Sequence, residues 1–319
     1  MYRHFDIIMN PIAGAGEAEL LVESVAVELR AEGHAVRVFR TTGPGDARKH
    51  AAQLVMPQVD AVLVAGGDGT ISEAIDGLLD DAAGGAARPP LAILPIGTEN
   101  LLGRCIGAKA SVVQAELTLL HGRVLEFDVP RIERPPDRGN EWDAGPGPRC
   151  GVGHFMSIAG MGFDAEVVHR LARTRAGNIN YANYFAPIVR TLYRYRFPTV
   201  RVEADGEVVC QEPAMVFVGN VPRYALGLSI CRDARVDDGL LDLVVFKCRN
   251  YFDLIEHSFW TLLRRHVGRK RVVYRQVRQV DVRSCQPVAL QVDGDDFGSV
   301  PARFSMPGQR VRLLAPPRR

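Results

Sequence analysis

The stretch Ala61-Val-Leu-Val-Ala-Gly66-Gly67-Asp68-Gly69-Thr70 decides the fold of the first part of the chain. Its opening apolar run predicts a strand buried on both faces, as the strands of parallel sheets are. The glycines that follow allow a tight turn in which backbone amides approach a ligand closely, and a helical pattern over Ile71–Leu79 comes next. A turn that opens a helix in this way favours a bound phosphate.

The carboxylate of Asp68 would by itself repel a phosphate at this turn. Its presence predicts either Mg²⁺ between the carboxylate and the phosphates, or hydrogen bonds from a ribose or another hydroxyl to the carboxylate. The alternative is a plain glycine-rich turn in which Asp68 only caps the helix.

Strand and helix patterns alternate on both sides of this stretch. This alternation predicts a parallel sheet with helices on both faces. The expected strands are Phe5–Met9, Ala35–Phe39 and Leu91–Leu94, and the expected helices are Leu20–Arg30 and Asp46–Val55.

Three more turns rich in glycine, hydroxyl and amide groups follow strands of this predicted sheet. The carboxyl ends of parallel strands share one edge, where ligands bind, so the turns predict a site for a nucleotide with several phosphates. Neither a Walker A motif nor a Rossmann glycine fingerprint is present. The candidate nucleotide-binding residues are Asn10, Pro11, Gly14, Thr42, Gly66, Gly67, Asp68, Gly69, Thr70, Gly97, Thr98 and Asn100.

After Gly122 the pattern changes to short β-type runs separated by turns, which predicts an antiparallel sandwich- or barrel-like domain. We therefore expect one domain over residues 1–124 and a second over 125–319, with the tail from about residue 308 packing back on the first. A helical apolar pattern from Phe252 to Leu263 is expected to pack on the β core. The expected strands are Arg123–Val129, Phe155–Ile158, Val200–Glu203, Ala214–Val218, Leu241–Phe246, Val280–Val282, Val288–Val292 and Val311–Leu314.

Composition excludes several classes of protein. The 319 residues exceed the usual size of one hydrophobic core, and 47% hydrophobic with 24% charged residues is ordinary for globular proteins. The net charge of +2 gives no general reason to expect a nucleic acid partner, and no apolar run is long enough to span a bilayer. The six cysteines form no CxxC pair, which suits a reducing, cytoplasmic environment.

Several motifs together resemble the diacylglycerol kinase catalytic-domain family, which includes bacterial lipid kinases, sphingosine kinases and ceramide kinases. The glycine turns of the first domain are joined by Gly160-Met-Gly-Phe-Asp-Ala165, by Ala234-Arg-Val-Asp-Asp-Gly-Leu-Leu-Asp242 and by Val292-Asp-Gly-Asp295, in the order that the family has them. GGDGT alone is less specific, because NAD kinases also carry it and phosphofructokinases carry GGDG. This sequence departs from the family's motifs at two positions: it has Leu101 where the family often has Asp, and Asp295 where the family has Glu.

The resemblance implies an α/β plus β protein: an N-terminal parallel-sheet nucleotide-binding domain similar to NAD kinase and phosphofructokinase, and a C-terminal antiparallel β-sandwich-like domain. It implies phosphoryl transfer from ATP, with Mg²⁺, to a hydroxyl of diacylglycerol or a related lipid alcohol. Asp293 resembles the general base, and Asp68 and Asp128 resemble acidic residues around the nucleotide and catalytic Mg²⁺. Asp295 would contact the nucleotide or metal, and a structural Mg²⁺ would bind at Asp237, Asp238 and Leu240.

Several of these aspartates also have a purely structural interpretation. Asp293 precedes Gly294, which is a common hairpin signal, Asp128 fits a solvated strand end, and Asp237 and Asp238 fit a tight turn. NAD kinase activity, and a non-catalytic protein that binds lipid or nucleotide, are the alternative functions.

Two basic stretches without acidic residues, Arg170–Arg196 and Arg264–Arg278, contain or border aromatic residues. They predict transient contact with a membrane surface, so the expected location is cytoplasmic and peripheral at the inner membrane face. The expected partners are a lipid substrate and the membrane, without a specific nucleic acid, and a homodimer is left open. RNA binding or a solvated helix face would give the same pattern.

Overall fold

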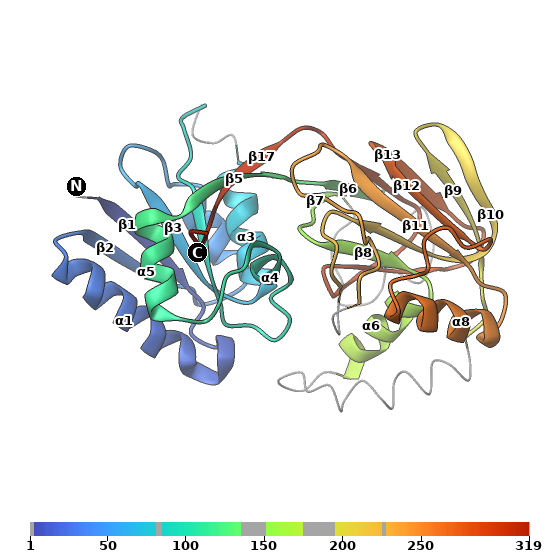
Figure 1. Cartoon of the computed structure of the whole chain (residues 1–319), viewed down its shortest axis with the longest axis horizontal. Helices are drawn as coiled ribbons and strands as arrows, with labels where there is room; N and C mark the ends of the chain where they lie inside the picture. The colour runs from blue at the N-terminus through green and yellow to red at the C-terminus, as the bar shows by residue number, and fades with distance from the viewer. Residues whose placement is uncertain (1–2, 81–84, 135–150, 175–194, 225–227, 319) are drawn as a thin grey trace. The chain divides into compact units, whose positions relative to one another are not determined.

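The structure is a computed structural model that describes residues 3–80, 85–134, 151–174, 195–224 and 228–318. The chain divides into two compact units, one of residues 1–128 with 309–319 and one of residues 129–308 (Figure 1). The boundary predicted between residues 124 and 125 falls inside a strand, so the division comes after Asp128 instead.

The first unit is built on a six-stranded sheet in the order β2-β1-β3-β4-β17-β5. The first five of these strands run parallel, four of them as the sequence predicts and β17 in addition, and β5 runs antiparallel to β17 at the sheet's edge. The expectation that the whole strand near residues 123–129 belongs to the β domain is wrong, because it forms the edge of this first sheet. The strand near residues 311–314 lies in the tail that is expected to pack back on the first domain, and it joins the same sheet. The strands are β1 (His4–Met9), β2 (Ala35–Arg40), β3 (Ala61–Gly66), β4 (Leu91–Pro95), β5 (Arg123–Asp128) and β17 (Arg310–Ala315).

Helices cover both faces of this sheet. Helices α1 and α5 share an apolar core with one face, to which Ile7 and Leu63 contribute. Helices α2 and α3 contact each other, and the general right-handed rule for crossovers between parallel strands assigns them to the other face. The elements are η1 (Ala13–Gly16), α1 (Glu17–Ala31), α2 (Asp46–Ala51), α3 (Asp68–Leu78), α4 (Leu101–Ile106) and α5 (Val112–His121).

The second unit is an antiparallel β domain with its own apolar core. Its long strand β10 pairs with β9 over residues 207–213, with a register shift between Val208 and Cys210, and then with β11 and β8 over residues 214–219, so one strand joins the two parts of the domain. Helices α6 (Phe163–Thr174) and α8 (Tyr251–Leu262) accompany the strands. The strands are β6 (Arg131–Arg134), β7 (Gly151–His154), β8 (Ile158–Met161), β9 (Thr199–Ala204), β10 (Glu207–Gly219), β11 (Leu241–Lys247), β12 (Val272–Val277), β13 (Gln279–Arg283), β14 (Ala289–Val292), β15 (Asp295–Ser299) and β16 (Ala302–Ser305).

Helix α8 differs from the expectation. Its inner face is formed by Leu254, His257 and Thr261, whereas Phe252 is 83% exposed and Ile255 is 63% exposed. The prediction that the apolar pattern packs on the core is therefore wrong, because the buried face contains polar residues and the apolar stripe lies outside. Among the described residues, no helix is long and apolar enough to cross a membrane.

Candidate functional site

The turns that follow β1, β3 and β4 contact one another at the carboxyl edge of the first sheet. A Cβ added at Gly14, where φ is +61°, would lie 2.3 Å from Cγ2 of Ile96, and one added at Gly97 would lie 2.6 Å from Cα of Gly67. The amide of Ile96 also donates to the carbonyl oxygen of Gly66 at 3.0 Å. Glycine is required where these turns approach each other, which explains two of the motif positions by packing.

Asn10 joins the first turn to the second. Its Nδ2 donates to Oγ1 of Thr70 at 3.1 Å, and its Oδ1 accepts from the amide of Ile12 at 3.2 Å. Its own amide donates to the carbonyl oxygen of Ala65 at 3.0 Å. Asn10 therefore holds the β1 turn against the start of α3, and its role in the structure is to position other groups.

The start of α3 offers amides to a ligand. Gly67 is the N-cap in extended backbone (φ −89°), and the first helical bond runs from the amide of Ile71 to the carbonyl of Gly67. The amides of Asp68, Gly69 and Thr70 thus have no acceptor within the helix. Gly69 is exposed, as is Thr98 in the neighbouring turn. Amides at a helix N-terminus beside an exposed hydroxyl suit phosphate oxygens.

Two carboxylates lie together at this edge. Burial raises the pKa of Asp68, the amides of Leu101, Asn100 and Leu102 oppose that rise, and the nearby charge of Glu99 adds to it. Oδ1 of Asp68 is buried and, within the described residues, accepts no hydrogen bond. Sequence reasoning missed Glu99, although it lies inside the turn quoted for Gly97 and Asn100.

The structure corrects the assignment of Asp128 to a catalytic metal site. Asp128 pairs in register with Arg310, three residues before Leu313, and Leu313 pairs with Leu91 at the start of β4. It therefore lies at the amino edge of the sheet, roughly 20 Å along the strands from the turns at the carboxyl edge. Its buried carboxylate accepts a hydrogen bond from Nε of Arg310 at 2.6 Å. Asp128 stabilises the pairing of the last two strands.

Thr42 lies in the turn after β2 and is engaged by the protein itself. Its amide, its hydroxyl and the amide of Gly43 all donate to Oδ2 of Asp46, at 2.9, 2.7 and 3.0 Å. These bonds, with the Thr42 hydroxyl first, lower the pKa of Asp46. The amide of Gly45 donates to Oε1 of Glu73 on α3 at 2.9 Å, which ties this turn to the same helix.

In the second unit Asp293 is held firmly by backbone amides. Its Oδ2 accepts from Met156 at 2.7 Å, and its Oδ1 accepts from Ser157 and Ile158 at 2.8 and 3.1 Å. With φ +51°, and φ +87° at Gly294, the two residues form the turn between β14 and β15. The hairpin interpretation thus describes the backbone, and the carboxylate is positioned as an acceptor at the end of β14.

A buried network beneath this hairpin was missed by sequence reasoning. Oδ2 of Asp164 accepts from the hydroxyl of Tyr224 at 2.8 Å and from Nε2 of Gln291 at 3.3 Å, and Oε1 of Gln291 accepts from the amide of Gly294 at 2.9 Å. Burial raises the pKa of Asp164 to about 6, against the effect of the Tyr224 and Gln291 hydrogen bonds. Two of the quoted motifs, around Asp164 and Asp293, therefore meet in one network.

The other residues predicted for the second unit do not belong to this network. Oδ1 of Asp238 accepts from the amide of Leu240 at 3.1 Å, and Asp237 forms an ion pair with Arg235 at 3.4 Å, which describes a tight turn. Asp295 is exposed at the start of β15. Of the described part of the chain, no group of three or more His, Cys, Asp or Glu side chains is arranged to hold a metal.

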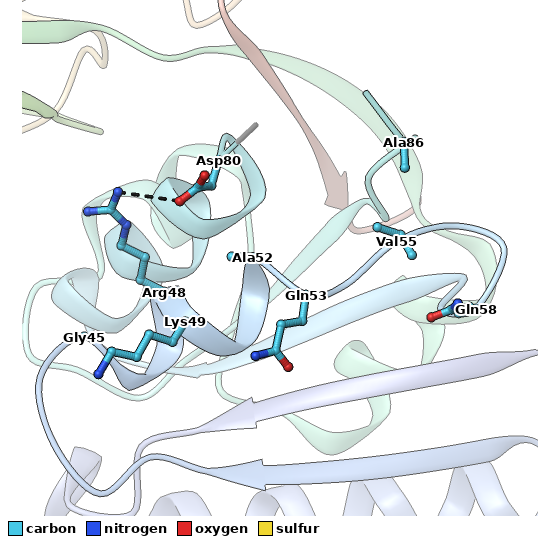
Figure 2. A pocket seen from close by; sticks show the side chains of 9 residues that line it. All are labelled: Gly45, Arg48, Lys49, Ala52, Gln53, Val55, Gln58, Asp80 and Ala86. Atoms are coloured by element: carbon cyan, nitrogen blue, oxygen red, sulfur yellow. Dashed lines mark ion pairs between the residues drawn. The ribbon is translucent and has the colours of Figure 1, made fainter. Parts of the chain in front are cut away.

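The first unit also contains a pocket of about 1080 Å³ beside α2 (Figure 2). Its lining includes Arg48 and Lys49 of α2 and Gln53 just after this helix, and Arg48 forms an ion pair with Asp80 at 3.8 Å. None of the candidate site residues lines it. Most of the basic stretch from Arg170 to Arg196, residues 175–194, lies outside the described residues.

Comparison with known proteins follows the same division of the chain. Residues 4–132 match the family model of the diacylglycerol kinase catalytic domain. Residues 157–315 match the model of the YegS C-terminal NAD kinase beta sandwich-like domain.

Similar proteins cover nearly the whole chain. A protein of Staphylococcus carnosus named diacylglycerol kinase is 24% identical over 318 residues, 99% of this chain and 96% of the relative. One of Bacillus subtilis with the same name is 25% identical over 314 residues, 97% of this chain and 95% of the relative. A crystal structure of a diacylglycerol kinase from Bacillus anthracis has the same fold, with a TM-score of 0.71 at 23% identity, covering 99% of this chain and 97% of that one.

Proposed function

This chain belongs to the diacylglycerol kinase catalytic-domain family, and from that premise we propose that it is an ATP-dependent lipid kinase. The family makes it a kinase with an alcohol acceptor. The proposal adds that ATP is the donor and that the acceptor is the hydroxyl of diacylglycerol or a related lipid alcohol.

One observation carries the proposal: the turns after β1, β3 and β4 meet at the start of α3, where three helix amides, an exposed glycine and an exposed threonine are available. The contacts at Gly14 and Gly97 leave no room for side chains, so backbone lines this edge. Such an edge fits a chain of phosphates, which needs donors at close range more than it needs apolar volume.

The residues present also fit Mg²⁺. Asp68 and Glu99 supply two carboxylates beside the phosphate turn, and Mg²⁺ is commonly held by one or two carboxylates together with substrate phosphates. Bound there, the ion would neutralise charge on the transferred phosphoryl group. Asp68 and Glu99 replace the predicted pair of Asp68 and Asp128.

For the acceptor, the proposal assigns Asp293 as the base that takes the proton of the lipid hydroxyl. Three backbone amides orient its carboxylate, since Oδ2 accepts from Met156 and Oδ1 accepts from Ser157 and Ile158. A base must be held at hydrogen-bond reach of its substrate, and a carboxylate fixed by backbone amides meets that need better than one on a free side chain.

The test is transfer of radiolabelled phosphate from ATP to a panel of lipids, with NAD and water as further acceptors. We expect label on diacylglycerol or another lipid alcohol, and loss of transfer when Mg²⁺ is chelated. Label on NAD alone would establish the second candidate, an NAD kinase, which the NAD kinase beta sandwich-like match of the second unit supports. ATP binding without transfer to any acceptor would indicate a binding protein.

A further inference from the structure

Helix α8 presents an apolar stripe to solvent on the second unit. Phe252, Ile255, Phe259, Leu262 and Leu263 are all exposed, and their spacing places them on one face of the helix. The opposite face, with Leu254 and His257, is buried against the β domain. Apolar residues scattered singly over a surface need no explanation, but a contiguous stripe along one helix marks an interaction surface.

The stripe is bordered by cations at the carboxyl end of the helix. Arg264 and Arg265 follow α8 directly, and Lys270 lies further along. All three are exposed, and within the described residues none of them has an ion-pair partner. Other cations of the same basic stretch are neutralised, since Arg271 pairs with Asp253 and Arg275 pairs with Glu207. Only a few cations of the stretch Arg264–Arg278 are thus without an ion-pair partner among the described residues, and two of them, Arg264 and Arg265, adjoin the stripe.

Aromatic residues stand at both ends of the helix. Tyr251 begins α8 and is partly exposed, and its hydroxyl donates to the carbonyl oxygen of Tyr195 at 3.1 Å. Near the other end, the guanidinium of Arg269 lies 3.7 Å from the ring centroid of Trp260. Amphipathic aromatic side chains of this kind favour the boundary between water and apolar groups.

We propose that the outer face of α8 docks on an anionic phospholipid bilayer, with the apolar stripe among the headgroups and acyl chains and with Arg264 and Arg265 on lipid phosphates. Apolar residues beside cations at the end of a short helix match a helix that lies in the membrane interface. A second copy of the chain fits less well, because a symmetric contact would place one net positive face against another. Docking deepens the proposed function, since a lipid acceptor resides in a bilayer, but its test needs no catalysis.

The experiment measures cosedimentation of the full chain with vesicles of phosphatidylglycerol and phosphatidylcholine in equal parts, without ATP. The double variant Phe252→Ser/Ile255→Ser should weaken binding about tenfold or more. The matched control Val152→Ser/Val208→Ser removes two exposed apolar side chains from strands of the same unit and should bind as the wild type does. Circular dichroism and thermal melting confirm that each variant is folded.

A second arm tests the charges. Arg264→Gln/Arg265→Gln should weaken binding to the anionic vesicles at low salt and leave the weak binding to pure phosphatidylcholine unchanged, because the screened attraction to lipid phosphate is what these residues supply. The matched control Arg278→Gln alters a cation of the same basic stretch at the other end of β12, and should have little effect.

The outcomes separate the explanations. Vesicle binding that both double variants leave intact would overturn the proposal. A concentration-dependent dimer in light scattering that is lost in Phe252→Ser/Ile255→Ser would assign the stripe to a second copy and also overturn it. If phosphate transfer fails for every acceptor while vesicle binding depends on α8, the docking surface stands and the kinase proposal falls.

Discussion

A methyl group added at Gly67 meets different surroundings from one added at Gly97, although the two glycines contact each other. At Gly67 the nearest atom to an added Cβ is Cα of Gly97 at 3.4 Å, which is an ordinary contact, and φ of −89° suits any residue. At Gly97 an added Cβ would lie 2.6 Å from Cα of Gly67 and 2.8 Å from Oδ1 of Asn100, and neither the backbone nor the bonded amide can yield easily.

We therefore expect Gly67→Ala to fold normally and to bind ATP about tenfold or more weakly, because the added carbon stands between the phosphates and the amides of α3. Gly97→Ala should instead lower the melting temperature. Isothermal titration with ATP and thermal melting of both variants provide the comparison. Wild-type ATP affinity in folded Gly67→Ala would remove this turn from the nucleotide site.

Substitution of Asp293 by Asn should have two effects that can be measured separately. The amide nitrogen of Asn would face backbone amides that now donate to a carboxylate, and a buried donor left without an acceptor costs about 1–3 kcal/mol, so the melting temperature should fall. Turnover, assayed well below the melting transition, should fall roughly 10²-fold or more, which is the scale of a positioned base. ATP affinity should change little. A folded variant with near wild-type turnover would leave hairpin anchoring as the role of Asp293.

At the scale of elements, the hairpin between β14 and β15 is connected to α6 through Asp164, Tyr224 and Gln291. The pKa of Asp164 rises from its ordinary 3.8 to about 6 because the carboxyl is buried. The folded state therefore binds the proton more tightly than the unfolded chain does. The stability that protonated Asp164 gives to the folded state is therefore complete below about pH 4 and is lost as the pH rises through about 6.

We expect the free energy of unfolding of the second unit to decrease between these pH values by an amount on the order of 2 kcal/mol that Asp164→Asn abolishes. Urea unfolding followed by tryptophan fluorescence reports on this unit, because both tryptophans, Trp142 and Trp260, belong to it. Tyr224→Phe removes a hydrogen bond that lowers the pKa, so in this variant the decrease should extend to higher pH. Parallel pH curves for wild type and Asp164→Asn would show that Asp164 does not titrate in this range.

Local sequence patterns predicted some of these elements and missed others. The strand–turn–helix signal from Ala61 to Thr70 is local, and the predicted strand, turn and helix all form there. Asp128 was misassigned because its place is set by Arg310, 182 residues further along the chain, and no local pattern records that pairing. The network of Asp164, Tyr224 and Gln291 joins three distant segments and was missed for the same reason.

Helix α8 shows a different limit. The spacing of Phe252, Ile255 and Phe259 marks one face of a helix, but periodicity states only that the residues share a face. Which face meets the core depends on the β domain, and here the core takes the face with His257 and Thr261. Glu99 could have been found from the sequence, because it belongs to a turn already assigned to the phosphate edge.

At the scale of the whole molecule, the second unit is an insertion into a hairpin of the first. Strands β5 and β17 are antiparallel neighbours, Asp128 is the register partner of Arg310, and residues 129–308 form the loop between them. Without β17, β4 and β5 each lose a partner strand, and the buried side chains of Val311, Leu313 and Leu314 are removed from the core.

Residues 1–128 expressed alone should therefore fail to fold. A shortened chain in which Asp128 is joined to Arg310 through Asn-Gly should fold, because this dipeptide favours the two-residue turn that closes antiparallel strands. Amide proton spectra with dispersed signals for the joined chain, and collapsed signals for residues 1–128, are the expected result. Dispersed signals from residues 1–128 alone would show that β17 is dispensable.

The insertion also reverses the order in which the two units can be completed on the ribosome. Synthesis proceeds from the N-terminus, and domains generally fold as they emerge. The second unit is continuous in sequence and has all its strands before residue 309 is made, whereas the first must wait for Arg310–Ala315. Throughout that interval the nascent chain exposes the unpaired edges of β4 and β5, which are the kind of surface that chaperones protect and that misassembles when translation stalls.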